Sequence, residues 1–235
     1  MKQLLIFFVC CVSAFSSFGQ DSIPVTEPKK VLDSLYREDQ FYVGLTFNLL
    51  VNRSTGIDQS GFSGGLHLGF IRDMPINKLR NVAIGLGVGY SFNTYGQNLS
   101  INVDDTNGNG VFEALDGSDF DTNRFTTHLA EVPLEFRWRT SVPETHKFYR
   151  IYAGLRFGYL FHFRSNFEKG DIKVRETKVD ELNRLRYGAT FTFGWNTYNF
   201  SVYYSLNPLF NDDAKIDGER VGLNPIKIGL TFYIL

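Results

Sequence analysis

Residues 149–161 read YRIYAGLRFGYLF and alternate between two kinds of side chain. The odd-numbered positions carry Tyr, Ile, Ala, Leu, Phe, Tyr and Phe, whereas the even-numbered positions include two arginines and two glycines. A period of two is typical of a β-strand, whose successive side chains point to opposite faces. This stretch therefore predicts a strand with one apolar face and one charged or small face.

The same alternation recurs along the chain, which predicts further strands at 41–51, 62–70, 82–92, 126–138, 185–195, 200–206 and 226–234. Long polar connections at 93–124, 164–183 and 208–222 alternate with short ones at 72–80, 140–148 and 196–199. An even number of strands, asymmetric connections and aromatic-rich faces are typical of outer-membrane barrels. We expect an all-β fold, an eight-stranded antiparallel up-and-down transmembrane β-barrel in a bacterial outer membrane. A soluble β-barrel or β-sandwich is the alternative.

The composition agrees with a barrel and limits the classes of partner and site that we expect. Aromatic residues make up 16% of the 235 residues, and the 25 acidic side chains balance the 24 basic ones. This balance gives no support to nucleic acid as a partner. The only cysteines are Cys10 and Cys11, so the rest of the chain has no thiol for a disulfide or a Cys-based metal site.

The N-terminus has the layout of a secretory signal peptide. Lys2 precedes an apolar run over 4–12, and small residues follow at 16–19. We expect a signal peptide at 1–19, a periplasmic N-terminal lead at 20–40 and an outer-membrane β-barrel domain at 41–235.

Charged residues occupy the faces opposite the apolar ones on three consecutive predicted strands. In an eight-stranded barrel these faces point into a lumen that side chains nearly fill, so we expect paired charges and no wide passage. Two histidines on predicted barrel strands, His67 and His128, are expected to be satisfied by hydrogen bonds and not to bind a ligand. The predicted lumen charge network comprises Glu131, Glu135, Arg137, Arg150, Arg156, Arg184 and Arg186.

One long connection has the register of a calcium-binding loop. Between residues 105 and 116, oxygen-bearing side chains stand at relative positions 1, 3, 5, 9 and 12, with glycine at position 6. We predict a calcium site, and otherwise no cofactor; the alternative is a solvated acidic loop with Asn-Gly turns. The predicted ligands are Asp105, Asn107, Asn109, Val111 through its carbonyl, Glu113 and Asp116.

Three segments carry a resemblance to a known family: Gly85-Leu86-Gly87-Val88-Gly89-Tyr90, Leu129-Ala130-Glu131-Val132-Pro133-Leu134-Glu135-Phe136 and Pro225-Ile226-Lys227-Ile228-Gly229-Leu230-Thr231-Phe232. From Phe41 to Leu235 the chain resembles a PorT-family outer-membrane β-barrel protein, a porin-like family associated with type IX secretion. The resemblance implies an outer-membrane barrel, and its namesake branch serves the export of surface proteins.

These observations lead us to expect a non-enzymatic outer-membrane barrel that anchors or assists a surface or periplasmic protein complex. Its expected partners are outer-membrane lipid and other membrane or secretion-system proteins. One alternative is a lipid-modifying hydrolase centred on His162 and Ser165, a nucleophile and base pair of the kind that acts on lipid. A small diffusion pore is a further alternative, which a crowded lumen disfavours.

Overall fold

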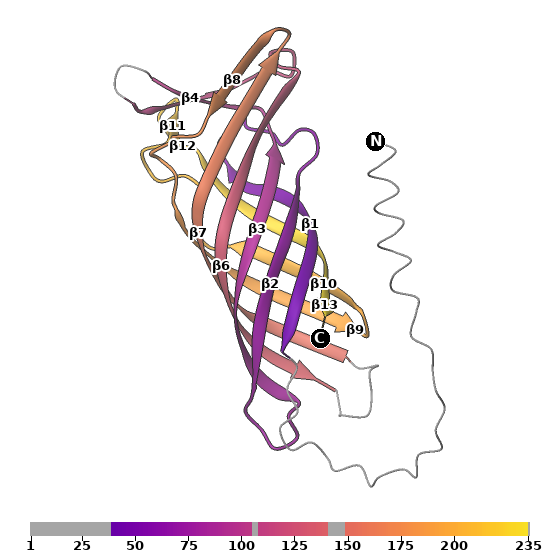
Figure 1. The fold of residues 1–235 in the computed structure, drawn as a ribbon. Helices are drawn as coiled ribbons and strands as arrows, with labels where there is room; N and C mark the ends of the chain where they lie inside the picture. The colour runs from indigo at the N-terminus through magenta and orange to yellow at the C-terminus, as the bar shows by residue number, and fades with distance from the viewer. Residues whose placement is uncertain (1–38, 105–107, 141–148, 235) are drawn as a thin grey trace, which may run out of the picture. The chain divides into compact units, whose positions relative to one another are not determined.

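The computed structural model describes residues 39–104, 108–140 and 149–234. Within these ranges eight long strands form the barrel wall (Figure 1). They are β1 (Gln40–Arg53), β2 (Gly64–Pro75), β3 (Val82–Gly96), β6 (Thr122–Arg139), β7 (Tyr149–Lys169), β9 (Leu185–Trp195), β10 (Tyr198–Ser205) and β13 (Gly222–Ile234). Each contains most of one predicted strand, which confirms the period-two prediction. The predicted signal peptide and most of the predicted lead lie outside the described residues.

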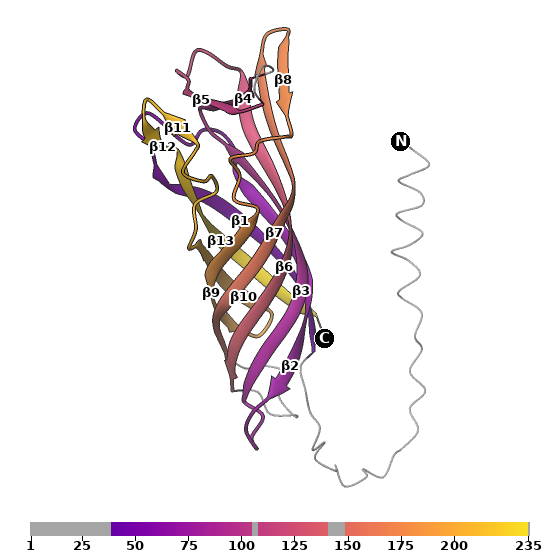
Figure 2. The same ribbon diagram turned by 90° about the vertical axis from the view of Figure 1, so that its left-hand side faces the viewer.

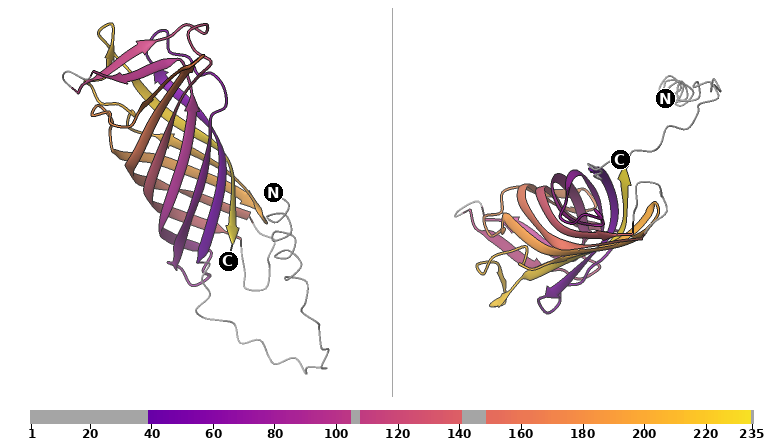
Figure 3. Two further views of the ribbon diagram at one scale, coloured as in Figure 1. Left: turned by 45° about the horizontal axis from the view of Figure 1, so that its top comes forward. Right: turned by 90° about the horizontal axis from the view of Figure 1, so that it is seen from below.

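The strands pair antiparallel with their neighbours in chain order. β6 pairs with both β3 and β7, and β13 pairs with both β1 and β10, so the sheet closes on itself. The strands run at a slant to the barrel axis, as closure of a sheet requires (Figure 3). The fold is therefore the predicted closed up-and-down barrel.

The two faces of the wall differ as the sequence predicts. On β1, Phe41, Leu45 and Phe47 point outward and each is more than half exposed, whereas Tyr42 and Asn48 point inward and are buried. On β7, Leu155 and Phe157 are exposed while Tyr152 is buried. Large exposed apolar side chains around a closed barrel are stable in lipid, not in water, so the outward face is the lipid-facing one.

A β-bulge reverses the faces of β7 near its upper end. His128 pairs with His162 and Leu129 pairs with Leu160, which leaves Phe161 without a partner on β6. An extra residue in one strand moves every later side chain to the opposite face. Above the bulge His162 therefore points outward, and Phe163 points inward and is buried.

Beyond the bulge the chain builds a folded extension, which we call the extracellular cap. It comprises the described residues of 54–63, 97–121, 170–184 and 206–221. Its strands are β4 (Leu99–Val103), β5 (Gly110–Ala114), β8 (Ile172–Glu176), β11 (Lys215–Ile216) and β12 (Glu219–Arg220), all at one end of the barrel (Figures 1 and 2). The short connections lie at the other end, which is the periplasmic one in outer-membrane barrels.

The cap shares an apolar core with the upper ends of the wall strands. Phe163 stacks on Phe125 at 5.6 Å between ring centroids, and Phe210 meets Phe112 at 5.2 Å. Further buried members are Leu50, Ile57, Tyr95, Leu99, Ile101, Leu129, Leu160, Val179, Leu182, Leu209, Ala214, Val221 and Leu223. The sequence predicted polar loops here; the structure instead places an apolar core above the polar lumen.

Candidate functional site

The lower lumen is built around one carboxylate, that of Asp73 on β2. Its two oxygens lie 3.1 Å from Nη1 of Arg137 and 2.9 Å from Nη1 of Arg139, and all three side chains are buried. Nε of Arg137 is 3.3 Å from Oε2 of Glu135, and its Nη2 donates to Gln40 at 2.8 Å. Both cations are thus held by acceptors in a water-poor interior, where an unpaired ion costs several kcal/mol.

The middle of the lumen holds a second group of charges. Oε2 of Glu131 lies 3.3 Å from Nη1 of Arg156, and its Oε1 lies 3.9 Å from Nζ of Lys227. His67 is satisfied as predicted, with Nδ1 2.7 Å from Oγ of Ser91 and Nε2 2.9 Å from Oγ1 of Thr46. The pairs Glu135–Arg137 and Glu131–Arg156 confirm the predicted pairing of lumen charges.

Two other predicted lumen cations, Arg186 and Arg150, donate to neutral acceptors. Arg186 donates to Oγ of Ser205 at 2.7 Å and to the carbonyls of Asn207 and Pro208. Arg150 donates to the carbonyl of Asn196 at 2.5 Å. Backbone carbonyls near the strand ends therefore replace the carboxylates that the sequence analysis expected for Arg186.

Arg184 and His128 lie outside the paired charges of the lumen. Arg184 is half-buried and precedes β9, and it forms no ion pair with another described residue, so its place in the lumen network stays a prediction. His128 points outward, because the lumen positions of β6 are the odd-numbered ones. Its Nδ1 lies 2.6 Å from the hydroxyl of Tyr90, which also points outward, so His128 is satisfied but on the lipid side.

The sequence analysis also missed three central charges. Asp73 and Arg139 lie just beyond the ends of the alternating runs from which β2 and β6 were predicted. Lys227 stands between Ile226 and Ile228, and this alternation already assigned it to the inward face. The signal for Lys227 was therefore present in the sequence.

The lumen is filled along its length. The cavity beside Tyr42, Lys227 and Tyr233 has a volume of about 30 Å³, and the one beside Tyr95 and Arg186 about 20 Å³. Each has room for one or two water molecules. The apolar core of the cap lies above them, so the described residues form a solid interior, as expected for eight strands.

The predicted hydrolase pair is not assembled. Ser165 points inward and is buried, whereas His162 points outward beside His128, with 5.1 Å between the ring centroids. Three residues apart on a regular strand, the two side chains occupy opposite faces. This pair therefore forms no nucleophile and base.

The predicted calcium loop is described only in part, because Asp105 and Asn107 lie outside the described residues. Of its other members, Val111 and Glu113 lie on β5, which pairs with β4. Oε1 of Glu181 accepts a 2.7 Å hydrogen bond from the amide of Gly110. No group of three or more acidic, His or Cys side chains that could hold a metal ion occurs among the described residues. The calcium site stays a prediction.

Comparison with known proteins places the chain in a family. No curated protein matches it. Among solved structures, it is similar to the crystal structure of Ail, the attachment invasion locus protein of Yersinia pestis, in complex with the heparin analogue sucrose octasulfate. The two share 14% sequence identity with a TM-score of 0.37, over 84% of this chain and 99% of that chain. The family model described as outer membrane protein beta-barrel domain matches residues 18–211. The chain therefore belongs to the outer membrane protein beta-barrel domain family.

Proposed function

We propose that this protein is a non-enzymatic outer-membrane barrel whose extracellular cap anchors or assists a protein complex at the cell surface. The observation that carries the proposal is the apolar core of the cap, which ties together four separate connections of the barrel. Buried apolar contacts give these connections a fixed shape, and a fixed surface binds a partner with a small loss of conformational entropy.

The filled lumen and the surface of the cap support the same role. With room for only a few waters, the lumen is suited to holding the wall rigid and not to passing solutes. On the cap, Val111 is 48% exposed and Ile172 is 60% exposed. Both side chains are therefore accessible to a partner that binds the cap.

The finer proposal is that the complex serves protein secretion. Its support is the resemblance to the PorT family, carried above all by Glu131-Val132-Pro133-Leu134. In cells that lack this protein, exported surface proteins should then accumulate in the periplasm. Normal export in such cells would remove the secretion role and leave the anchoring role to be tested separately.

Site-specific photocrosslinking tests the anchoring role. A photoreactive residue at Val111 or Ile172 should give discrete protein adducts in intact cells. The matched control is Phe157, which is 47% exposed but lies on the lipid-facing wall and should give no protein adduct. A folded protein with no adduct from either cap position would contradict the proposal.

A further inference from the structure

Three arginines gather on the outward face of the wall, just above its apolar band. Arg124 on β6, Arg164 on β7 and Arg175 on β8 are all exposed. Arg124 lies opposite Asn166, Asn166 lies opposite Arg175, and Arg164 lies opposite Thr126 one step below. We call Arg124, Arg164, Arg175 and Asn166 the arginine patch.

The height of the patch follows from the strand geometry. A tilted strand climbs roughly 2.5 Å per residue along the membrane normal, and the apolar band of such barrels is about 25 Å tall. On β6, an interval of ten residues separates Trp138 at the lower end from His128. This interval spans roughly 25 Å, so His128 marks the upper edge of the band. Arg164 and Arg124 then lie roughly 5 and 10 Å above it, at the level of the outer-leaflet headgroups.

The patch has no acidic partner of its own. Among the described residues none of its three arginines forms an ion pair. Glu168, which lies opposite Thr122 on β6 and Lys173 on β8, has its Oε1 3.7 Å from Nζ of Lys173. In contrast, each lumen arginine near a carboxylate is paired. Three unpaired guanidinium groups on one face repel each other and favour an anion.

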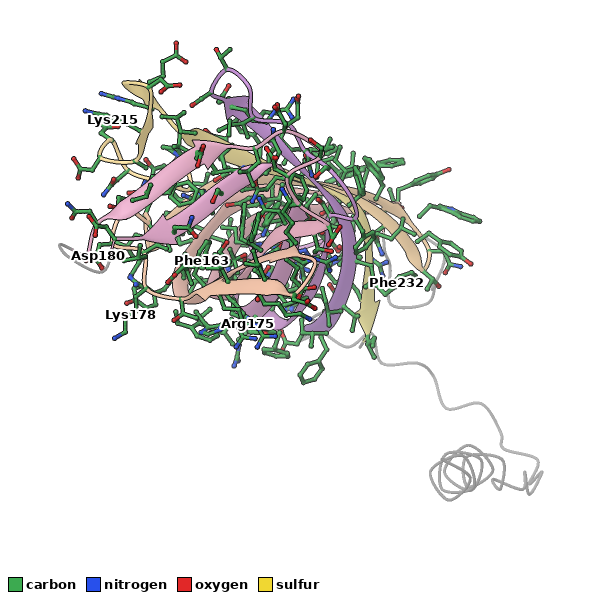
Figure 4. The ribbon with its side chains drawn as sticks, turned by 90° about the horizontal axis from the view of Figure 1, so that it is seen from above. Phe163, Arg175, Lys178, Asp180, Lys215 and Phe232 are labelled. Atoms are coloured by element: carbon green, nitrogen blue, oxygen red, sulfur yellow. The ribbon has the colours of Figure 1, made fainter. Side chains whose placement is uncertain are left out.

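The spacing of the patch suits a phosphate-bearing group. Arg124 and Arg175 stand two strands apart, about 10 Å between their backbones, with Asn166 between them. Flexible arginine side chains reach across this span, and their planar guanidinium groups bind phosphate with two parallel hydrogen bonds. In the view from above, Arg175 lies at the outer edge of the ribbon and Phe163 lies further inside (Figure 4).

A cleft of about 290 Å³ adjoins the patch, and its lining includes Arg124, Phe62, Phe120 and Asp121, whose Oδ2 accepts a 2.7 Å hydrogen bond from the amide of Gly170. Phe62 is 74% exposed, so an apolar ring stands at the edge of the cleft. A sugar ring packs well against aromatic faces, and an arginine at the rim of the same cleft holds a charged substituent of that sugar.

From these observations we propose that the arginine patch binds a phosphorylated glycolipid of the outer leaflet, with its phosphate on the arginines and its sugar against the cleft. The lipid is favoured over a free anion because the patch continues directly from the lipid-facing band. Acyl chains that already lie along the band bring the phosphate to the height of the patch.

The test uses the full-length mature barrel in detergent micelles and phosphorylated lipid A as the probe. Native mass spectrometry or a fluorescence titration compares this lipid with its enzymatically dephosphorylated form. The wild type should prefer the phosphorylated form by about tenfold or more, and R124Q/R164Q/R175Q should lose that preference. Equal binding of both lipid forms by the wild type would overturn the proposal.

Two controls separate the patch from general charge effects. The variant R72Q/K178Q/K215Q removes the same number of positive charges from exposed positions elsewhere, and it should keep the preference. A loss of preference in this variant as large as in the patch variant would show net charge to be the cause, against the proposal. Inorganic pyrophosphate should compete only weakly; full displacement of the lipid by it would assign the patch to free anions. Heat-modifiable migration on gels verifies that each variant is folded.

Discussion

Asp73 is the residue whose replacement tests the lumen network most directly. Its carboxylate is buried and holds two buried guanidinium groups, those of Arg137 and Arg139, at 3.1 and 2.9 Å. Asp73→Asn keeps the shape of the side chain and removes its charge. Arg137 retains Glu135, whereas the ion pair of Arg139 with Asp73 is lost. The variant therefore removes one negative charge from between two buried cations.

The expected cost follows from the burial of the pair. Removing one partner of a buried ion pair typically destabilises a protein by about 3–5 kcal/mol, because the remaining charge stays buried. The matched control is Asp212→Asn, which breaks a pair with Arg220 at the same 2.9 Å but with both side chains 68% exposed. Water and salt screen that pair, so its loss should cost less than about 1 kcal/mol.

Equilibrium unfolding in lipid vesicles by guanidinium chloride measures both values. Tryptophan fluorescence is a suitable signal, because the chain has two tryptophans, Trp138 and Trp195, on outward positions of the wall. Asp73→Asn combined with Arg139→Met should cost less than the sum of the single variants. A cost for Asp73→Asn no larger than that of the exposed control, with no coupling to Arg139, would refute the reasoning and show that water solvates these charges.

Three further predictions concern the wall and the cap. Phe157→Arg should lower the free energy of unfolding by about 2–4 kcal/mol if residue 157 lies near the bilayer midplane. Spin labels at 157 and 156 should report lipid and lumen environments, respectively, and equal exposure of both labels to lipid would contradict the register. Gly229→Ala should cost about 1–3 kcal/mol, because its Cβ would collide with the carbonyl oxygen of Leu45. Gly158→Ala should be nearly neutral, because its Cβ would come no closer to a neighbour than 3.3 Å, to a side-chain atom of Leu129. Heat-modifiable gel migration ranks the two variants, and equal stability would contradict the close approach of β13 to β1. Millimolar calcium should protect residues 100–120 from protease in the wild type but not in Asp105→Ala, with a dissociation constant of about 10⁻⁴–10⁻³ M by calorimetry; no calcium effect in the wild type would remove the site.

The wall of the barrel could be predicted from the sequence because a period of two is a local property of the chain. The alternation within one strand shows which side chains share a face. It assigned Phe157 to lipid and Arg156 to the lumen without knowledge of the neighbouring strands. The same reasoning assigned Glu131 and Glu135 to the interior, where their pairing with arginine follows from the cost of burying a lone charge.

The partners of those charges and the form of the cap depended on the tertiary structure. Asp73 and Arg139 are brought together by strands that are distant in sequence. Arg186 donates to the carbonyl of Asn207, which lies just after the end of β10. One extra residue, Phe161, turns His162 outward and Phe163 into the cap core. Alternation within a strand cannot show such a shift, because a bulge is defined only by the pairing with the neighbouring strand. Cap residues such as Leu182 and Phe210 are buried by contacts between separate connections, which no single segment encodes.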